Sequence, residues 1–277
     1  MKNRALIIVA AIFGLFVFNY NAAAGYLDSY SNITIKDKNS SESSGWYGPQ
    51  EDTEVEPGAV KGQNWDLEGF YAFESTLAMV GGYDFINGED GVEPGDIFID
   101  VDGDAEYGPV NNGTGYGKTD VENNFGYDYV LDMDYSSGTP TYTVFELIDK
   151  GVGVSGSINK TVIYKSMQES NPWVYVSGGK QVASGTAWYM AGLTNTALGL
   201  DGDDALDGGS HNMMTVDLSF LPSGTIYTAH YTMECGNDSL MGQGSAAGVP
   251  EPATIFLLGS GLLGLFGYRK KIKKTDK

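Results

Sequence analysis

The densest group of potential ligand side chains is an acidic run near residue 100. Asp100, Asp102, Asp104 and Glu106 stand at alternate positions, with Gly103 among them. Carboxylate oxygens at this density suit a hard cation such as Ca²⁺, which takes oxygen ligands at about 2.4 Å. The run departs from an EF-hand loop, in which the glycine is sixth and a bidentate glutamate is twelfth. A calcium site in a loop between strands and a strand that ends in an acidic turn are both consistent with this pattern.

A second acidic run, weaker as a calcium site, contains Asp201, Asp203 and Asp204. With the following Asp207-Gly208-Gly209 it is similar to a single Gly/Asp repeat of the RTX type. Such repeats need tandem copies to stack on one another, and this one occurs once.

Evidence for catalysis is sparse. The chain has only two histidines, His211 and His230, and neither has neighbours at metal-ligand spacing. No nucleophile elbow, zincin motif or phosphate loop occurs. His230 falls on the polar side of its strand alternation, which predicts a hydrogen-bonded surface residue.

Trp46, Trp173 and Trp188 are either core residues or exposed rings that stack on sugars. We therefore expect a non-enzymatic protein.

Period-two alternation of apolar and polar residues dominates the middle of the chain and predicts β-strands with one wet face. It is clearest over residues 65–73, 97–101, 127–133, 214–220 and 227–235. Less regular strands are expected at 33–35, 76–85, 141–147, 160–165, 173–176 and 186–190, and one or two helical turns within 191–200. With Gly-rich turns between them, these segments predict an all-β fold, an antiparallel β-sandwich and, more narrowly, a jelly roll.

The charge of this middle part is strongly negative. Residues 25–250 contain 8 basic and 34 acidic residues, a net charge of −26. Such a surface repels nucleic acid and anionic lipid and attracts divalent cations. With so many acids, some close carboxylate pair of the glycosidase kind is inevitable and carries no information. Cys235 is the only cysteine, so no intramolecular disulfide is expected.

The first 24 residues have the pattern of a secretory signal peptide. Lys2 and Arg4 precede an uncharged run that extends to Phe18, and Ala22 and Ala24 supply the small residues of a cleavage site. We expect cleavage before Gly25, and hence export.

The C-terminus has three parts in a fixed order. Val249, Pro250, Glu251 and Pro252 form a rigid, extended motif, because proline fixes φ and disfavours helix in the preceding residue. The uncharged segment 253–268 would span roughly 24 Å as a helix, slightly short of a bilayer core. A basic stop follows, which marks the cytoplasmic side: Arg269, Lys270, Lys271, Lys273 and Lys274.

This order of parts resembles the PEP-CTERM sorting signal of Gram-negative bacteria. The resemblance implies export, a transient stop in the inner membrane, and processing by exosortase, a transpeptidase-like membrane enzyme. It further implies a final place at the cell surface or in the extracellular matrix, in association with exopolysaccharide or biofilm. A plain C-terminal membrane anchor is the alternative.

The sequence therefore predicts five regions. They are a signal peptide (1–24), a loosely ordered acidic segment (25–64), a β-sandwich body (65–238), a Gly/Ser/Ala linker (239–248) and the sorting signal (249–277). The function that fits best is an exported, non-enzymatic surface or matrix protein that binds Ca²⁺ and extracellular polysaccharide. Its partners are the export machinery and exosortase, and it contacts the membrane only through the C-terminal helix before processing. A secreted glycan-active enzyme and a Ca²⁺-dependent carbohydrate-binding module are the alternatives.

Overall fold

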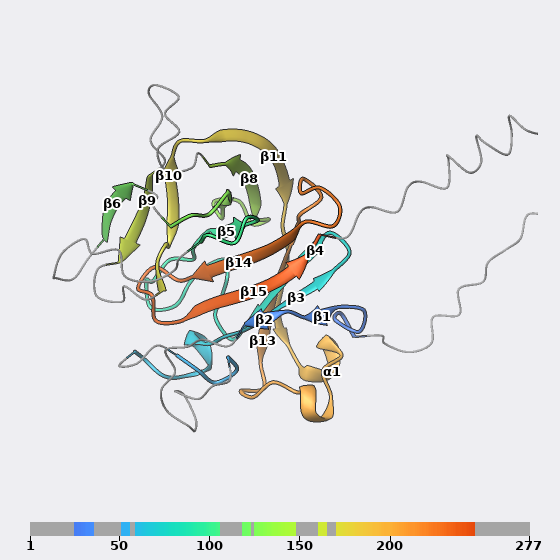
Figure 1. Cartoon of the computed structure of the whole chain (residues 1–277). Helices are drawn as coiled ribbons and strands as arrows, with labels where there is room; N and C mark the ends of the chain where they lie inside the picture. Colours follow the sequence, from blue (N-terminus) through green and yellow to red (C-terminus); the bar gives the residue numbers. More distant parts are fainter. Residues whose placement is uncertain are drawn as a thin grey trace, which may run out of the picture.

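Two antiparallel sheets make up most of the structure, a computed structural model (Figure 1). It describes residues 25–35, 51–55, 59–105, 118–122, 125–147, 160–164 and 170–246. The five-stranded sheet has the order β1 (Ser31–Asn32), β3 (Leu67–Phe73), β4 (Thr76–Gly81), β13 (His211–Asp217) and β12 (Trp188–Leu193). The seven-stranded sheet has the order β11 (Lys180–Thr186), β8 (Thr141–Glu146), β7 (Tyr129–Asp134), β5 (Ile97–Asp100), β14 (Ile226–Thr232), β15 (Ser239–Ser245) and β2 (Thr34–Ile35).

Within the described ranges, a smaller three-stranded sheet and three short helical segments accompany the two large sheets. The sheet has the order β10 (Val174–Ser177), β9 (Lys160–Tyr164) and β6 (Lys118–Glu122). The helical segments are η1 (Gln63–Trp65), α1 (Asn195–Leu198) and η3 (Gly202–Asp204). Thr194 caps α1 by accepting the Ala197 N–H, and Gly199 ends it in the left-handed conformation.

The main core lies between the two large sheets. Phe70 and Met79 enter it from the five-stranded sheet, and Ile99, Leu131 and Tyr231 enter it from the seven-stranded sheet. All five side chains are fully buried. Because each sheet contributes one apolar face to this core, the architecture is that of a sandwich.

Smaller clusters cover the outer faces. Tyr71 and Val80 face outward from the five-stranded sheet and are covered by Leu27 and by Leu198 of α1. Phe98 and Val130 form a similar cluster on the outside of the seven-stranded sheet. Several strands are therefore buried on both faces, which a simple alternation of apolar and polar residues does not indicate.

The predicted all-β class and antiparallel sheets are confirmed. Period-two segments become β3, β5, β7, β13 and β14, and the expected helical turn is α1. The narrower expectation of a jelly roll stays a prediction.

The predicted linker over 239–248 is wrong for most of its length. Residues 239–245 form β15, which pairs with β14 along seven residues and with β2 on its other side. Gly242 of this strand lies directly over Phe70 of the opposite sheet. A Cβ at Gly242 would stand 2.8 Å from the Phe70 Cβ, so glycine here permits close packing between the sheets rather than flexibility.

The segment 25–64 is more ordered than expected where the structure describes it. Leu27 and Val55 are buried, with exposed fractions of 3% and 0%. The N–H groups of Tyr26 and Leu27 donate to carbonyls of α1, and Ser31–Asn32 pairs with β3. The ordered body therefore extends beyond the predicted limits of 65–238 at both ends.

A substitution at Gly242 tests the packing of β15. We expect Gly242→Ala to lower the free energy of unfolding by about 1–3 kcal/mol, because the added methyl group overlaps Phe70. Gly138→Ala is the matched control, since nothing lies within 4 Å of its added Cβ, and should be nearly neutral. Urea unfolding of both variants measures the difference. Equal stabilities would contradict the assigned position of β15.

Candidate functional site

The first predicted calcium site forms a compact turn after β5. Carboxylate oxygens of Asp100, Asp102 and Asp104 lie within 4.8 Å of one another. Asp100 is buried and the other two are exposed. Glu106, the fourth predicted ligand, lies outside the described residues.

Local hydrogen bonds explain much of this arrangement. Asp100 Oδ1 accepts the N–H groups of Asp102 and Gly103 at 3.1 and 2.9 Å, and Asp102 Oδ1 accepts the Asp104 N–H at 3.1 Å. Gly103 has a φ of 85°, which the turn requires and which side chains rarely adopt. These are the bonds of an ordinary acidic turn, so calcium at this loop stays a prediction.

The second predicted run does not form a cluster of its own. Asp201, Asp203 and Asp204 are exposed on and around η3. Asp203 and Asp204 instead line a pocket of about 710 Å³ that also contains Asp28, Asp52 and Glu68. Among the described residues that line this pocket there is no lysine or arginine.

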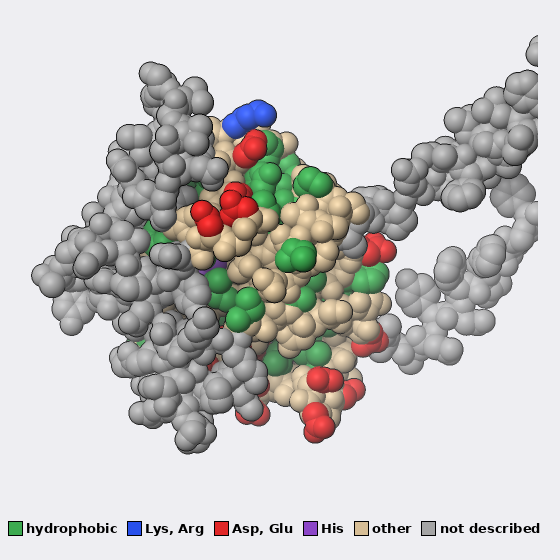
Figure 2. Space-filling model, viewed as in Figure 1, with side chains coloured by type: hydrophobic (Ala, Val, Ile, Leu, Met, Phe, Trp, Pro, Cys, Tyr) green, Lys and Arg blue, Asp and Glu red, His purple; other side chains and the backbone are tan. Residues whose placement is uncertain are grey.

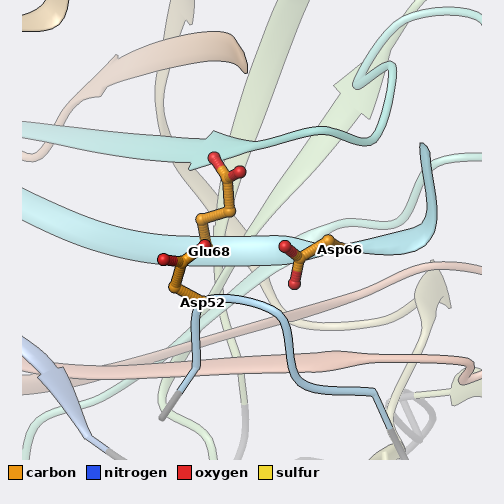
Figure 3. A group of neighbouring side chains, drawn as sticks. All are labelled: Asp52, Asp66 and Glu68. Carbon is orange, nitrogen blue, oxygen red and sulfur yellow. The ribbon is translucent and has the colours of Figure 1, made fainter. Parts of the chain in front are cut away.

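Three carboxylates meet at the base of this region, and sequence reasoning did not single them out. Glu68 belongs to the start of β3, Asp66 immediately precedes this strand, and Asp52 comes from the loop 51–55 beside it (Figure 3). One carboxylate oxygen from each lies within 4.8 Å of the other two. We call Asp52, Asp66 and Glu68 the carboxylate cluster.

A β-bulge at the start of β3 sets the direction of Glu68. The register with β4 shifts between Leu67 and Gly69, so that Glu68 is the extra residue. Such bulges re-aim single side chains and are frequent near functional sites. Leu67 enters the main core, while Glu68 faces His211 of β13 and the pocket.

Protein N–H groups hold each carboxylate in place. The Thr53 N–H donates to Asp66 Oδ2 at 3.0 Å, and the Asp207 N–H donates to Asp52 Oδ2 at 2.9 Å. Glu68 Oε1 accepts a bond from the Gln63 side chain at 2.6 Å. His211 Nδ1 lies 2.8 Å from both oxygens of Glu68.

The electrostatics of the cluster follow from burial and like charge. Burial, and then the negative charge of Glu68, raise the pKa of Asp66 to about 9. Burial also raises the pKa of Glu68 and of Asp52, while the contact with His211 acts in the opposite direction on Glu68. Burial, and then the negative charges of Glu54 and Asp66, raise the pKa of the neighbouring Asp238, which is fully buried. Oxygen ligands at this spacing suit a hard cation.

Both histidines are fully buried, and the predicted surface position of His230 is wrong. Its Nε2 lies 3.0 Å from the Pro172 carbonyl oxygen, and its ring stacks on Tyr127 at 5.7 Å. The alternation of residues in β14 predicts that His230 is on the solvent-exposed face of the strand, but residues of the 170–173 segment cover that face. Burial lowers the pKa of His230 to about 4.

The three tryptophans separate into different environments. Trp173 is buried, which is one of the two environments that the sequence allowed, whereas Trp188 on β12 is 47% exposed. The Trp188 ring makes an edge contact with Tyr26 at 5.4 Å. Trp46 lies outside the described residues.

Residues 248–271 match the family model described as the PEP-CTERM protein-sorting motif. The chain carries this sorting motif. It confirms the resemblance seen in the sequence and implies an exported protein that exosortase sorts. The comparisons with curated proteins and with solved structures returned no match.

The parts of the PEP-CTERM signal lie outside the described residues, as does the signal peptide 1–24. These parts are the motif Val249–Pro252, the apolar segment 253–268 and the basic stop from Arg269 to Lys274. Within the described ranges, no helix is long and apolar enough to cross a membrane.

The buried His230 predicts a specific acid sensitivity. Its pKa is about 4 when folded and about 6.5 when unfolded, so the unfolded chain binds more protons between these values. Stability therefore falls as the pH drops from 6.5 to 4, by about 3 kcal/mol from this group alone.

Unfolding by urea at several pH values, for wild type and His230→Gln, isolates this contribution from that of the buried acids. We expect the stability difference between the two proteins to change by about 3 kcal/mol between pH 7 and pH 4. A difference that is constant with pH would contradict the burial of a neutral imidazole.

Proposed function

We propose that this chain is a non-enzymatic protein of the bacterial cell surface or extracellular matrix. The observation that carries the proposal is the PEP-CTERM motif at residues 248–271. Exosortase removes the segment after the motif, and the β-sandwich is the cargo. Its strongly acidic sequence, with a net charge of −26 over residues 25–250, favours recruitment of cations and, through them, of anionic polysaccharide. Acidic side chains are spread over the face in Figure 2.

The packing of Gly25 supports cleavage of the signal peptide immediately before it. The Gly25 nitrogen lies 2.9 Å from Asp28 Oδ2, which would form an ion pair with a new α-ammonium group. A Cβ at Gly25 would stand 2.1 Å from the Gly199 Cα, so this position accepts only glycine. After such cleavage Gly25 would be the first residue of the mature protein, packed against Gly199 at the end of α1.

Exposed aromatic rings favour a direct contact with glycans. Trp188 and Tyr26 form an exposed pair at the edge of the five-stranded sheet. Aromatic rings combine an apolar face with low conformational entropy and are suited to packing against the apolar faces of sugar rings. The same observation supports the second candidate, a Ca²⁺-dependent carbohydrate-binding module.

Substitution of the motif tests the sorting. We expect the triple variant Pro250→Ala, Glu251→Ala, Pro252→Ala to remain unprocessed in the inner membrane of a host that contains exosortase. Intact-mass spectrometry of the wild-type product should report Gly25 as the first residue and loss of the basic C-terminal segment. Alanine substitution of Lys36 and Lys38, which are far from the motif in the sequence, is the control. A variant that is processed and released normally would refute the proposal.

Binding to purified extracellular matrix tests the role of the exposed aromatic pair. We expect Trp188→Ala to weaken matrix binding about fivefold, the equivalent of ~1 kcal/mol for one stacked ring. Phe73→Ala is the control, because Phe73 is also exposed but packs beside Tyr30 instead. Binding that Trp188→Ala leaves unchanged would remove this contact from the account. Release of reducing sugars by the wild-type protein would favour the alternative, a secreted glycan-active enzyme.

A further inference from the structure

The carboxylate cluster differs from two other buried carboxylates of the sandwich, Asp96 and Asp238. Asp96 and Asp238 are also buried, and in each both oxygens accept a backbone N–H at 2.6 to 2.8 Å. Asp66 is buried to the same degree, with an exposed fraction of 0%, yet only its Oδ2 accepts a bond. Its Oδ1 has no hydrogen-bond partner among the described residues.

Asp52 repeats this pattern. Its Oδ2 accepts the Asp207 N–H, and its Oδ1 is inaccessible to solvent and has no partner among the residues that the structure describes. Two aspartates from different segments are therefore each fixed by one oxygen. In both, the remaining oxygen is left for another ligand.

A buried carboxylate oxygen without a partner is costly. Loss of hydration without a compensating bond destabilises a polar group by about 1–3 kcal/mol, and more for a charged group. Such a group therefore calls for a ligand that the protein itself does not supply. A cation bound between the carboxylates would satisfy such an oxygen and neutralise the repulsion between the carboxylates.

Glu68 is the third member of the cluster, and two neighbouring side chains hold its carboxylate in position. Gln63 and His211 contact its carboxylate and fix its orientation, as hydrogen-bonding partners do for metal-ligating carboxylates. Gln63 is itself anchored by a bond of its side-chain amide to the Ser210 carbonyl oxygen at 3.1 Å.

The pocket supplies a route to the cluster. Asp52 and Glu68 are among its lining residues, and Asp28, Asp203 and Asp204 line it as well. A cleft lined by charges of one sign concentrates ions of the opposite sign. Its volume of about 710 Å³ leaves room for the waters that complete the coordination of a bound ion.

The spacing of the oxygens is compatible with calcium, and their chemistry favours it over softer metals. Two ligands on opposite sides of Ca²⁺, each at about 2.4 Å, lie up to about 4.8 Å apart, and all ligand atoms of the cluster fall within that distance. Mg²⁺ binds at about 2.1 Å and demands a stricter octahedron. Softer metals prefer nitrogen or sulfur ligands.

We propose that Asp52, Asp66 and Glu68 bind one Ca²⁺ ion at the base of the acidic pocket. The ion joins the loop 51–55 to Asp66 and to the first residues of β3, and the Thr53–Asp66 hydrogen bond also links these segments. Calcium thus fastens the N-terminal part of the body onto the five-stranded sheet. This site goes beyond the proposed surface function, and its failure would leave the sorting and glycan-binding tests unaffected.

Calorimetric titration of the full chain with CaCl₂ tests the proposal. The protein is purified in detergent, stripped with a chelator and dialysed. We expect one saturable site, of the submillimolar to millimolar affinity that extracellular calcium modules show, and a higher melting temperature with calcium than with chelator. Asp66→Asn keeps the shape of the side chain and should weaken this site at least tenfold. It should also abolish the calcium-dependent rise in melting temperature.

Matched variants make the result decisive. Asp52→Asn should weaken the site in the same way, and it guards against misfolding of the more buried Asp66 variant. Asp102→Asn removes a carboxylate from the separate turn after β5 and should leave this site unchanged. MgCl₂ should bind more weakly than CaCl₂. Identical wild-type melting curves with calcium and with chelator, or wild-type calcium affinity in both Asp66→Asn and Asp52→Asn, would overturn the proposal.

Discussion

Much of this structure depends on the need of buried carboxylates for hydrogen-bond donors or a cation. A charged oxygen inside a protein must find N–H donors or a cation, because burial removes its water. Asp96 and Asp238 meet this requirement with backbone N–H groups and thereby connect separate strands. Asp96 joins the seven-stranded and three-stranded sheets through Met133 and Tyr175. Asp66 meets it only in part, and the proposed calcium site rests on this difference.

An exported protein with a single cysteine must be stabilised by interactions other than an intramolecular disulfide. With a single cysteine, the chain has no intramolecular disulfide to constrain it outside the cell. The outer face of the five-stranded sheet is instead covered by the segment around Leu27 and by α1. The acidic pocket lies where these coverings meet the loop 51–55. The proposed cation would add a link at this junction, where a small hydrophobic cluster and backbone hydrogen bonds hold the covering segments.

Local pattern predicted the fold class well, because period-two alternation reflects a single buried sheet face. It failed where burial depends on distant segments. Ser239–Ser245 has the composition of a flexible linker, yet Gly242 is required there because Phe70 of the opposite sheet approaches closely. His230 was assigned to a wet face that the segment at Pro172 covers. No local signal reports either contact.

The candidate site shows the same limit. The calcium sites predicted from the sequence consist of acidic residues that are close along the chain. The carboxylate cluster instead brings Asp52 together with Asp66 and Glu68, which are separated from it in the sequence. The Asp-x-Glu pair at the start of β3 was visible, but its burial was not, because the covering loop looked unstructured. The sorting motif could be identified from sequence alone, since its three parts are contiguous and their physical roles are local. The motif bears on the sorting of the protein, whereas the carboxylate cluster belongs to the β-sandwich that is sorted.

The most direct test of the account is a crystal structure of the protein grown with CaCl₂, with anomalous diffraction recorded. The account predicts an anomalous peak between Asp52, Asp66 and Glu68, with their oxygens at about 2.4 Å from it. The absence of a peak, with Asp66 protonated and hydrogen-bonded directly to Glu68, would contradict it.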